Sequence, residues 1–476
     1  MFGDFGTNFF YKMLKINDLR DFWGFKMWTV CEKKVVWTAL ASFLCVFLLA
    51  CDRGGQVPGQ GENRGSPASQ VEPRPMEYSG NLWLGTRSGE EVAEIYSFVG
   101  RDTLKHRFIL RRREEMGVAK PVPDSLKGAT VLYVPVQKVV ALSSAQIGYM
   151  VRLGVQDRIV GIGEGRYVYD STLYARAING EVREVGNGGT LDLEKVVALE
   201  PDLVMTFATG GAHDDYERIN ALSLPLMLTS EWQEETPLAK AEWIKLYGKL
   251  FGVEPLADSI FEQSKKNYLN TANGGVAGVS PAEGVADDKG RSPTKSGMTF
   301  GRSEGETSSV NDSSLVTSNS ELVTPNSLCP RVLVGMSYGG IWYAPGGNSF
   351  TARLIKDAGG CYLWASDTSR ELKFTLEEIM LVADSADVWV NPGMFSTTAE
   401  LLASEPRVEH IRAFREKRVC QNDGRKGPGG GNDFYESAVA YPAELLQNLR
   451  NCLYNATIGP DSASLGLDWY HNISIF

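Results

Sequence analysis

The sequence predicts an α/β fold with two similar halves, each built on a parallel sheet. Three observations support this prediction. Short apolar runs of strand length alternate with segments of helical periodicity from Gln137 onward. The same alternation resumes at Pro330, and a mainly helical region lies between the two stretches. A chain of 476 residues also fits two domains better than one.

The first half contains three predicted strands and two predicted helices. The strands are the short apolar runs at 139–142, 158–162 and 203–207. The helices are expected at 144–153 and 191–199, where apolar residues recur with helical spacing. This alternation is typical of a parallel sheet whose strands are connected by helices.

The second half repeats the pattern. A strand is predicted at 332–335 and a helix at 349–358, with Asn348 or Ser349 as its N-cap. FTLEEIMLVADSADVWV then predicts a helix followed by a strand. Near the end, YPAELLQNLRNCLY predicts a helix that begins at Pro442, a favoured residue for the first helical turn.

Two segments of different character separate the halves. Residues 234–272 are expected to be mainly helical and to include the connecting helix, with one buried face formed by Ala239, Trp243, Leu246 and Leu250. Residues 273–328 are rich in Gly, Ser, Thr, Asp and Glu and contain too little apolar surface to offset the entropy of ordering. We predict a disordered, low-complexity insertion there.

The amino-terminal region has the pattern of an exported, lipid-anchored protein. Residues 27–50 combine a basic flank with an apolar run too short for a confident membrane span, as in a signal peptide. The run ends on LLAC, which resembles the bacterial lipobox and makes Cys51 the expected lipidated residue. Residues 51–77 are expected to be a tether, and 1–26 a non-native extension before a start at Met13 or Met27. An ordinary cleavage site, with an incidental Cys51, is the alternative.

Cysteines, histidines and charge exclude several classes of function. The mature chain retains four further cysteines, which are not at metal-binding spacing and whose pairing the sequence leaves open: Cys329, Cys361, Cys420 and Cys452. The four histidines are scattered singly, so we expect no metal site and no cofactor. The net charge of -10 argues against nucleic acid as a partner. We expect a monomer.

The segment VLVGMSYGGIWYAPGGNSF fits two interpretations. Its Gly335-Met336-Ser337-Tyr338-Gly339 matches the G-x-S-x-G pattern of a serine-hydrolase nucleophile. That motif needs a helix directly after the serine, but glycines and Pro345 follow within ten residues. A hydrolase would also have to use His410 or His471. A surface serine hydrolase therefore remains an alternative from a different class, and the favoured interpretation is the lip of a binding cleft.

Aromatic and polar residues recur at the carboxyl ends of the predicted strands in both halves. Ligands bind at this edge in parallel α/β domains, although ordinary packing would explain any single aromatic residue. On this basis we predict ligand contacts from Ser144, Arg166, Tyr167, Tyr169, Phe207, Trp342 and Tyr343.

A resemblance to a known family is carried by several motifs in order. The first half contains VVALSSAQIGYMVRLG, DRIVGIG and VGNGGTLDLEKVVALEPDLVM, and the second contains WYAPGGNSFTARLIKDAGGCYLW and GGNDFYESAVAYPAELLQNL. These resemble the binding proteins of ABC importers for iron-siderophore complexes, haem and cobalamin. The resemblance implies two Rossmann-like lobes, here 78–233 and 329–476, joined by a long helix, with the ligand cleft between them.

The family resemblance also implies site residues and partners. It adds Asp433 and Phe434, on the loop after GRKGPGGG, to the ligand site. It makes Glu194 and Glu377 the carboxylates that dock on a permease, with Glu378 as an adjacent competitor. The expected partners are a permease with its ATPase, a small metal chelate and, through the lipid, the periplasmic face of a bacterial membrane. The implied protein is a receptor and not an enzyme.

The chelate is expected to be an iron complex. Haem would need a tyrosine or histidine, which Tyr167, Tyr169 or Tyr343 could supply. Anionic siderophores would need arginines such as Arg166 and Arg425. Cobalamin-type members carry a tryptophan shortly before the first docking glutamate, where this chain has GG, so a corrinoid is the second choice. A sensor that borrows the binding fold is a further alternative.

Overall fold

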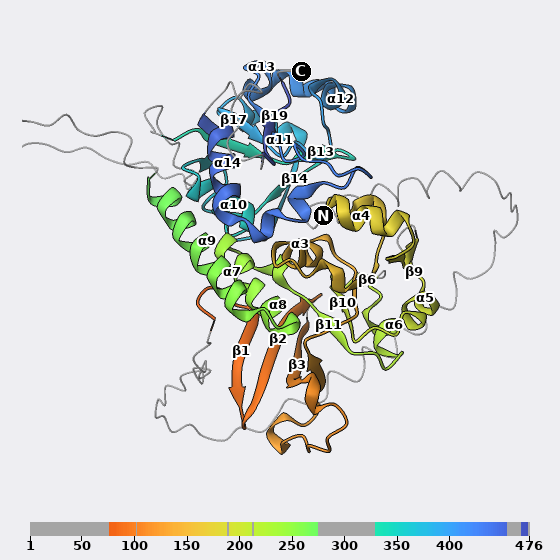
Figure 1. Ribbon diagram of the computed structural model, residues 1–476. Helices are drawn as coiled ribbons and strands as arrows, with labels where there is room; N and C mark the ends of the chain where they lie inside the picture. Colours follow the sequence, from red (N-terminus) through yellow and green to blue (C-terminus); the bar gives the residue numbers. More distant parts are fainter. Residues whose placement is uncertain are drawn as a thin grey trace, which may run out of the picture. The chain divides into compact units, whose positions relative to one another are not determined.

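The computed structural model describes residues 76–100, 102–187, 190–211, 214–274, 329–454 and 468–474 (Figure 1). The predictions for the extension at 1–26, the signal at 27–50, the lipidated Cys51, its tether and nearly all of the 273–328 insertion lie outside these residues. Within the described ranges, no helix combines the length and the apolar character that crossing a membrane requires.

The amino-terminal lobe is built on a five-stranded sheet in which every neighbouring pair is parallel. Its strands are β5 (Val139–Ala141), β6 (Ile159–Ile162), β7 (Arg183–Glu184), β10 (Leu203–Thr206) and β11 (Leu226–Leu228). Their spatial order is β11-β10-β5-β6-β7, so the chain order reverses at β5, as in Rossmann-type sheets. The sheet is connected through α3 (Ser144–Arg152), α4 (Ser171–Ile178), α5 (Leu193–Ala198) and α6 (Tyr216–Asn220), and a short pair, β8 (Gly186–Asn187) and β9 (Thr190–Leu191), stands apart.

The carboxy-terminal lobe has a second five-stranded sheet, in the order β15-β12-β17-β18-β19. Its strands are β12 (Arg331–Val334), β15 (Cys361–Tyr362), β17 (Val388–Val390), β18 (Val419–Gln421) and the antiparallel edge strand β19 (His471–Asn472). The helices are α10 (Phe350–Asp357), α11 (Leu376–Ala383), α12 (Thr398–Ser404), α13 (Arg412–Arg415) and α14 (Pro442–Tyr454). A three-stranded sheet packs beside them: β13 (Met336–Tyr338), β14 (Ile341–Pro345) and β16 (Glu371–Thr375). The predicted α/β fold with two lobes is confirmed.

Three helices connect the lobes: α7 (Pro237–Glu242), α8 (Ile244–Phe251) and the long α9 (Glu254–Gly274). Thr236 caps α7 by accepting a hydrogen bond from the backbone N–H of Ala239, and Pro237 occupies the first turn. The predicted apolar face of this region is buried. Because α9 packs against α8 on one side and α14 on the other, it contacts both lobes (Figure 1).

One sheet was not predicted. β1 (Leu82–Arg87), β2 (Glu90–Val99), β3 (Asp102–Arg112) and β4 (Thr130–Val134) form a four-stranded sheet whose inner face joins the core of the amino-terminal lobe. Its strands carry many charges, which obscured the apolar alternation. Glu94, for example, is fully buried because Lys105 and Arg107 of β3 neutralise it at 2.9 and 2.7 Å.

The four cysteines of the carboxy-terminal lobe form two disulfides, Cys329–Cys361 and Cys420–Cys452, a pairing that the sequence left open. Each bridge joins residues 32 positions apart. Loss of either bridge should therefore increase the conformational entropy of the unfolded chain by a similar amount. Cys420 and Cys452 are also buried, the first in β18 and the second in α14.

We expect the double variant Cys420→Ser/Cys452→Ser to lose about 3–4 kcal/mol of unfolding free energy or more, because two hydroxyl groups would also enter the core. Urea unfolding would measure the loss. The matched control is Cys329→Ser/Cys361→Ser, whose loop has the same length but whose sulfur atoms are less buried. A larger loss in the control pair would contradict this reasoning.

Candidate functional site

In the amino-terminal lobe, the loop after β6 carries three predicted ligand residues. Residues 165–167 form a single 3-10 turn that leaves Arg166 and Tyr167 exposed. The guanidinium of Arg166 lies 2.7 Å from the Glu164 carboxylate and 4.7 Å from the centre of the Tyr167 ring. Tyr169 is half-buried, and burial raises the pKa of its hydroxyl group.

The facing part of the carboxy-terminal lobe is the segment 425–436, which follows β18. Arg425 donates to the Asp433 carboxylate at 2.6 Å, and the Trp469 indole donates to the same oxygen at 2.8 Å. Asp433 is 0% exposed, so its predicted role at a cleft surface needs correction. A buried carboxylate is stable only when it is paired, and Arg425 is the charged partner of Asp433. The Asp433 carboxylate therefore holds the Arg425 guanidinium in position from inside the lobe.

The two segments contact one another across the lobes. The Arg425 guanidinium lies 4.9 Å from the centre of the Tyr169 ring. The Glu436 carboxylate accepts hydrogen bonds from the backbone N–H groups of Tyr169 and Asp170, at 2.7 and 2.9 Å. Residues predicted separately in the two halves, Arg166 to Tyr169 and Asp433, are therefore brought together by tertiary structure.

The glycine run in GRKGPGGG explains how the two segments approach so closely. A Cβ atom at Gly427 would lie 2.6 Å from the Tyr169 Cα, and one at Gly431 would lie 2.4 Å from the Tyr167 carbonyl oxygen. At Gly429 it would lie 2.9 Å from the Arg166 Cα. Such distances exclude any side chain, so the run serves as a backbone contact surface between the lobes and not as a phosphate loop.

Glu436 gives this contact a pH dependence. Burial raises the pKa of Glu436 to about 8, from an ordinary value of 4.5, although the two backbone donors act in the opposite direction. Between these pH values the unfolded chain has released the proton that the folded chain retains. The contribution of Glu436 to stability is therefore fully present below pH 4.5 and is lost as the pH rises to about 8.

We expect Glu436→Gln to remove this dependence. From pH 4.5 to 8 the unfolding free energy of the wild type should fall more steeply than that of the variant. The difference in slope should reach at most about 1.4 kcal/mol per pH unit. Urea unfolding across that range would measure both slopes. Parallel slopes would show that Glu436 is ionised in the folded protein.

The remaining predicted ligand residues lie apart from this contact. Ser144 begins α3 two residues beyond the end of β5, and Phe207 directly follows β10. Both are half-buried at the carboxyl edge of the sheet. Tyr343 is half-buried in β14, with the Lys373 ammonium 5.5 Å from its ring centre. Phe434 is half-buried against the rings of Tyr435 and Tyr470. Their roles as ligand contacts stay predictions.

Trp342 does not line a surface. Its side chain is 0% exposed, stacks on Trp389 with ring centres 5.5 Å apart, and donates to the Val334 carbonyl oxygen at 3.0 Å. The prediction that it contacts ligand is corrected accordingly, because alternation along β14 points Trp342 into the core and its neighbour Tyr343 outward.

Ser337 lies in an antiparallel hairpin and not at a strand-to-helix turn. It is paired with Trp342 between β13 and β14 and is 8% exposed. The chain continues from β13 into β14, so the sharp turn and following helix that a nucleophile elbow requires do not form. This geometry removes the support for the hydrolase interpretation.

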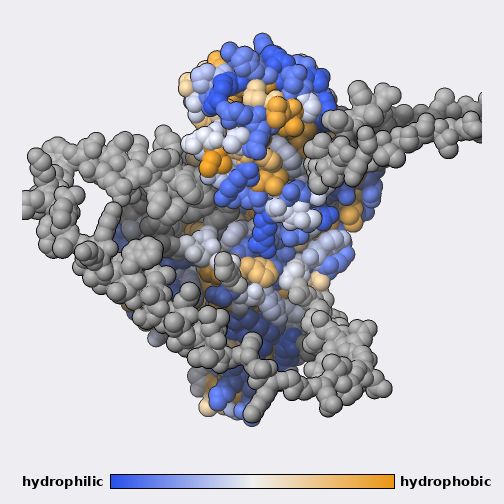
Figure 2. All heavy atoms as spheres, turned by 180° about the vertical axis from the view of Figure 1, so that it is seen from behind, coloured by the Kyte–Doolittle hydropathy of each residue, from blue (hydrophilic) through white to orange (hydrophobic). Residues whose placement is uncertain are grey.

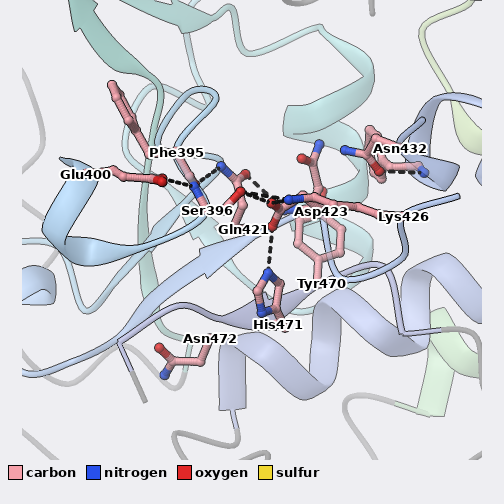
Figure 3. Close-up of polar contacts among 12 residues, drawn as sticks. Phe395, Ser396, Glu400, Gln421, Asp423, Lys426, Asn432, Tyr470, His471 and Asn472 are labelled. Carbon is pink, nitrogen blue, oxygen red and sulfur yellow. Dashed lines mark hydrogen bonds and ion pairs between the residues drawn. The ribbon is translucent and has the colours of Figure 1, made fainter. Parts of the chain in front are cut away.

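Sequence reasoning missed a polar cluster at the carboxyl edge of the second sheet (Figure 3). Asp423 accepts a hydrogen bond from the Ser396 hydroxyl at 2.6 Å, pairs with Lys426 at 2.7 Å, and lies 2.6 Å from the Nε2 atom of His471. Burial acts to raise the pKa of Asp423, but these three partners outweigh it and hold the pKa well below its usual range. The cluster fastens the start of the 425–436 segment, and its members are too scattered in sequence to form a motif.

Within the described ranges, no three His, Cys, Asp or Glu side chains converge in a way that could hold a metal ion. On the face seen in Figure 2, hydrophobic residues occur in small groups among hydrophilic ones.

The two predicted docking carboxylates occupy the first turns of equivalent helices. Glu194 is exposed on α5, which leads into β10, and Glu377 is exposed on α11, which leads into β17. Each of these strands lies next to the strand that comes first in the chain order of its five-stranded sheet, β5 in one lobe and β12 in the other. Glu378 is occupied by a capping box, accepting from the Thr375 N–H at 2.7 Å, which leaves Glu377 as the outward carboxylate.

Comparisons with known proteins agree with this fold. Residues 139–272 match a family model described as periplasmic binding protein. An uncharacterized lipoprotein of Methanocaldococcus jannaschii is 21% identical over 369 residues, which is 74% of this chain and 73% of that protein. For residues 139–272, the resemblance to periplasmic binding proteins that was inferred from the sequence is thus confirmed.

Solved structures to which the chain is similar include binding proteins that are named for different ligands. The periplasmic heme-binding protein RhuT from Roseiflexus sp. RS-1 has a TM-score of 0.45 and 16% identity, covering 67% of this chain and 98% of that chain. A possible iron-binding periplasmic protein from Staphylococcus epidermidis has a TM-score of 0.44 and 13% identity, covering 67% and 99%. The vitamin B12 binding protein BtuF of Vibrio cholerae has a TM-score of 0.41 and 12% identity, covering 68% and 99%.

Proposed function

We propose that this protein is the substrate-binding component of an importer, which captures an iron complex between its lobes and delivers it to a membrane permease. The single observation that carries the proposal is the meeting of residues from both lobes, with the Arg425 guanidinium over the Tyr169 ring and Glu436 bound to the facing backbone. The match of residues 139–272 to periplasmic binding proteins agrees with it.

The proposed action is binding without chemistry. Rings and guanidinium groups at facing strand ends suit a bulky, partly conjugated and anionic guest, because rings stack and arginines neutralise charge. An iron chelate such as haem or a ferric siderophore fits this description, and a corrinoid is the second candidate. The contact between the lobes and the α9 packing favour a modest closing movement over a wide one.

The proposed location is the periplasmic face of a bacterial membrane, with a lipid on Cys51 as the anchor. The relative from Methanocaldococcus jannaschii is itself described as a lipoprotein, which agrees with this proposal. The partner would be a permease with a separate ATPase, and the exposed Glu194 and Glu377 would contact basic groups on it.

The test is to purify the chain without residues 1–50 and record its visible absorption spectrum, followed by mass spectrometry of whatever co-purifies. Haem, ferric siderophores and corrinoids each have a distinct visible spectrum. The protein emptied of ligand should then bind the identified chelate again, seen as quenching of tryptophan fluorescence. If no chelate co-purifies and none from a panel of haemin, ferric siderophores and corrinoids binds, the proposal is wrong.

A further inference from the structure

We propose that the tip of the β2–β3 hairpin is a third wall of the ligand site, where Phe98 and the facing Arg370 contact an anionic chelate that carries conjugated rings. This inference rests on the proposed binding function and adds residues that no motif indicated. The hairpin belongs to the sheet that the sequence did not predict, and its two strands are 10 and 11 residues long.

The hairpin tip is fastened to the carboxyl edge of the first sheet. The side-chain amide of Gln233, just after β11, binds both backbone groups of Phe98: its oxygen accepts from the Phe98 N–H at 2.9 Å, and its nitrogen donates to the Phe98 carbonyl at 2.6 Å. Ser230 donates to the Tyr96 carbonyl oxygen at 2.7 Å. These three bonds hold the tip where ligands bind in parallel α/β sheets.

The tip also packs on the loop after β10, which carries the predicted ligand residue Phe207. A Cβ atom at Gly210, where φ is +82°, would lie 2.5 Å from the backbone nitrogen of Gly100. Only two glycines allow this approach. The hairpin thus lies beside a loop that was assigned to the ligand site for independent reasons.

Arg370 of the carboxy-terminal lobe lies close to Phe98 of the hairpin. Its guanidinium carbon lies 5.6 Å from the centre of the Phe98 ring. The glycines of YAPGGNS permit this position: a Cβ atom at Gly346 would lie 1.5 Å from the Ser369 carbonyl oxygen, and the Gly346 N–H donates to the Arg370 carbonyl oxygen at 3.0 Å. The glycine-rich loop thus holds the backbone of Arg370 in this position.

Both side chains are available to a ligand. Phe98 is 37% exposed and Arg370 is exposed. Across the described ranges, no carboxylate pairs with the Arg370 guanidinium, unlike Arg166 and Arg425, which are both paired. A ring beneath an unneutralised guanidinium can stack on a conjugated ligand while the cation binds its carboxylate or catecholate oxygens. Propionate-bearing haem and ferric catecholates share this chemistry.

The test compares Phe98→Ala and Arg370→Gln with the wild type in the full mature chain. The probes are haemin, a ferric catecholate siderophore and an uncharged ferric hydroxamate, titrated by tryptophan quenching. We expect Arg370→Gln to weaken binding of the anionic probe that the wild type accepts by about tenfold or more, and Phe98→Ala to weaken it similarly. Binding of the uncharged hydroxamate should not respond to Arg370→Gln. Comparing the affinities for haemin and for the catecholate siderophore shows which of these two anionic chelates the site prefers.

The matched controls are Met116→Ala and Arg112→Gln, which remove an exposed apolar side chain and an exposed arginine from the same amino-terminal sheet region. Both should leave affinity unchanged, and all four variants should unfold at nearly the wild-type temperature. Equal affinities of wild type, Phe98→Ala and Arg370→Gln would overturn the inference. Equal weakening of charged and uncharged probes by Arg370→Gln would also overturn it. That result would indicate that Arg370 stabilises the packing of the two lobes and does not contact the ligand. If the wild type binds no probe, the proposed function fails as well.

Discussion

Reversing the charge of both docking residues, Glu194→Lys with Glu377→Lys, is expected to abolish uptake while leaving ligand affinity intact. The two carboxylates are exposed on equivalent helices of the two lobes. Neither of them takes part in the printed contacts between the segment 425–436 and Tyr169 or Asp170. Like charges facing the basic groups of a permease would oppose docking at two points at once. Uptake of the radiolabelled chelate in cells and affinity of the purified variant are the two measurements.

The ion pair of Glu377 does not weaken this expectation. Its carboxylate lies 2.9 Å from Arg407, but the Glu377 side chain is 74% exposed, and exposed pairs contribute only about 0–1 kcal/mol. The carboxylate can therefore change partner at small cost. The control is Glu217→Lys with Glu409→Lys, which changes the net charge equally at two other exposed glutamates. Unchanged uptake in the first double variant, or equal loss in both, would reject the docking role.

Replacing Trp342 with alanine should lower the unfolding free energy by about 3–5 kcal/mol. The indole fills the core of the carboxy-terminal lobe against Trp389, and its loss also leaves the Val334 carbonyl oxygen without its 3.0 Å donor. Guanidinium unfolding followed by circular dichroism would measure the loss. Ligand affinity of the folded fraction should stay near that of the wild type.

Tyr343→Ala is the informative neighbour, because Tyr343 lies next to Trp342 in β14 but is only half-buried. It should cost clearly less stability than Trp342→Ala. If Trp342→Ala instead lowered ligand affinity without destabilising the fold, the original assignment of Trp342 to the ligand site would be correct and the core interpretation wrong.

Local features account for the parts of the fold that could be predicted. The apolar runs at β5, β10 and β17, and the helical spacing in α3, α10 and α14, depend on residues within one or two turns or strands. The four-stranded amino-terminal sheet was missed because its strands carry charges such as Glu94 and Arg107, whose mutual neutralisation requires two strands to be paired. The sequence of a single strand does not show which charged residues will lie opposite one another once the strands pair.

In the candidate site too, some features could be predicted from the local sequence and others depended on tertiary contacts. Strand ends could be located, so Tyr167, Tyr169 and Phe207 could be proposed. Which residue of a β-strand faces inward depends on its partner sheet, and Trp342 was therefore assigned to the wrong side. Asp433 was placed on the right loop but turns inward to Arg425 and Trp469.

By itself, the sequence determined the alternating elements, the two halves and the strand ends at which a guest could bind, because periodicity and turn residues act over short distances. Only the tertiary structure decided what those ends meet. The glycines at 427, 429 and 431 lie against the backbone of Arg166 to Tyr169, and Phe98 lies beneath Arg370 of the other lobe. Such contacts join residues far apart in the chain, and their distances depend on how both lobes and the amino-terminal sheet pack together.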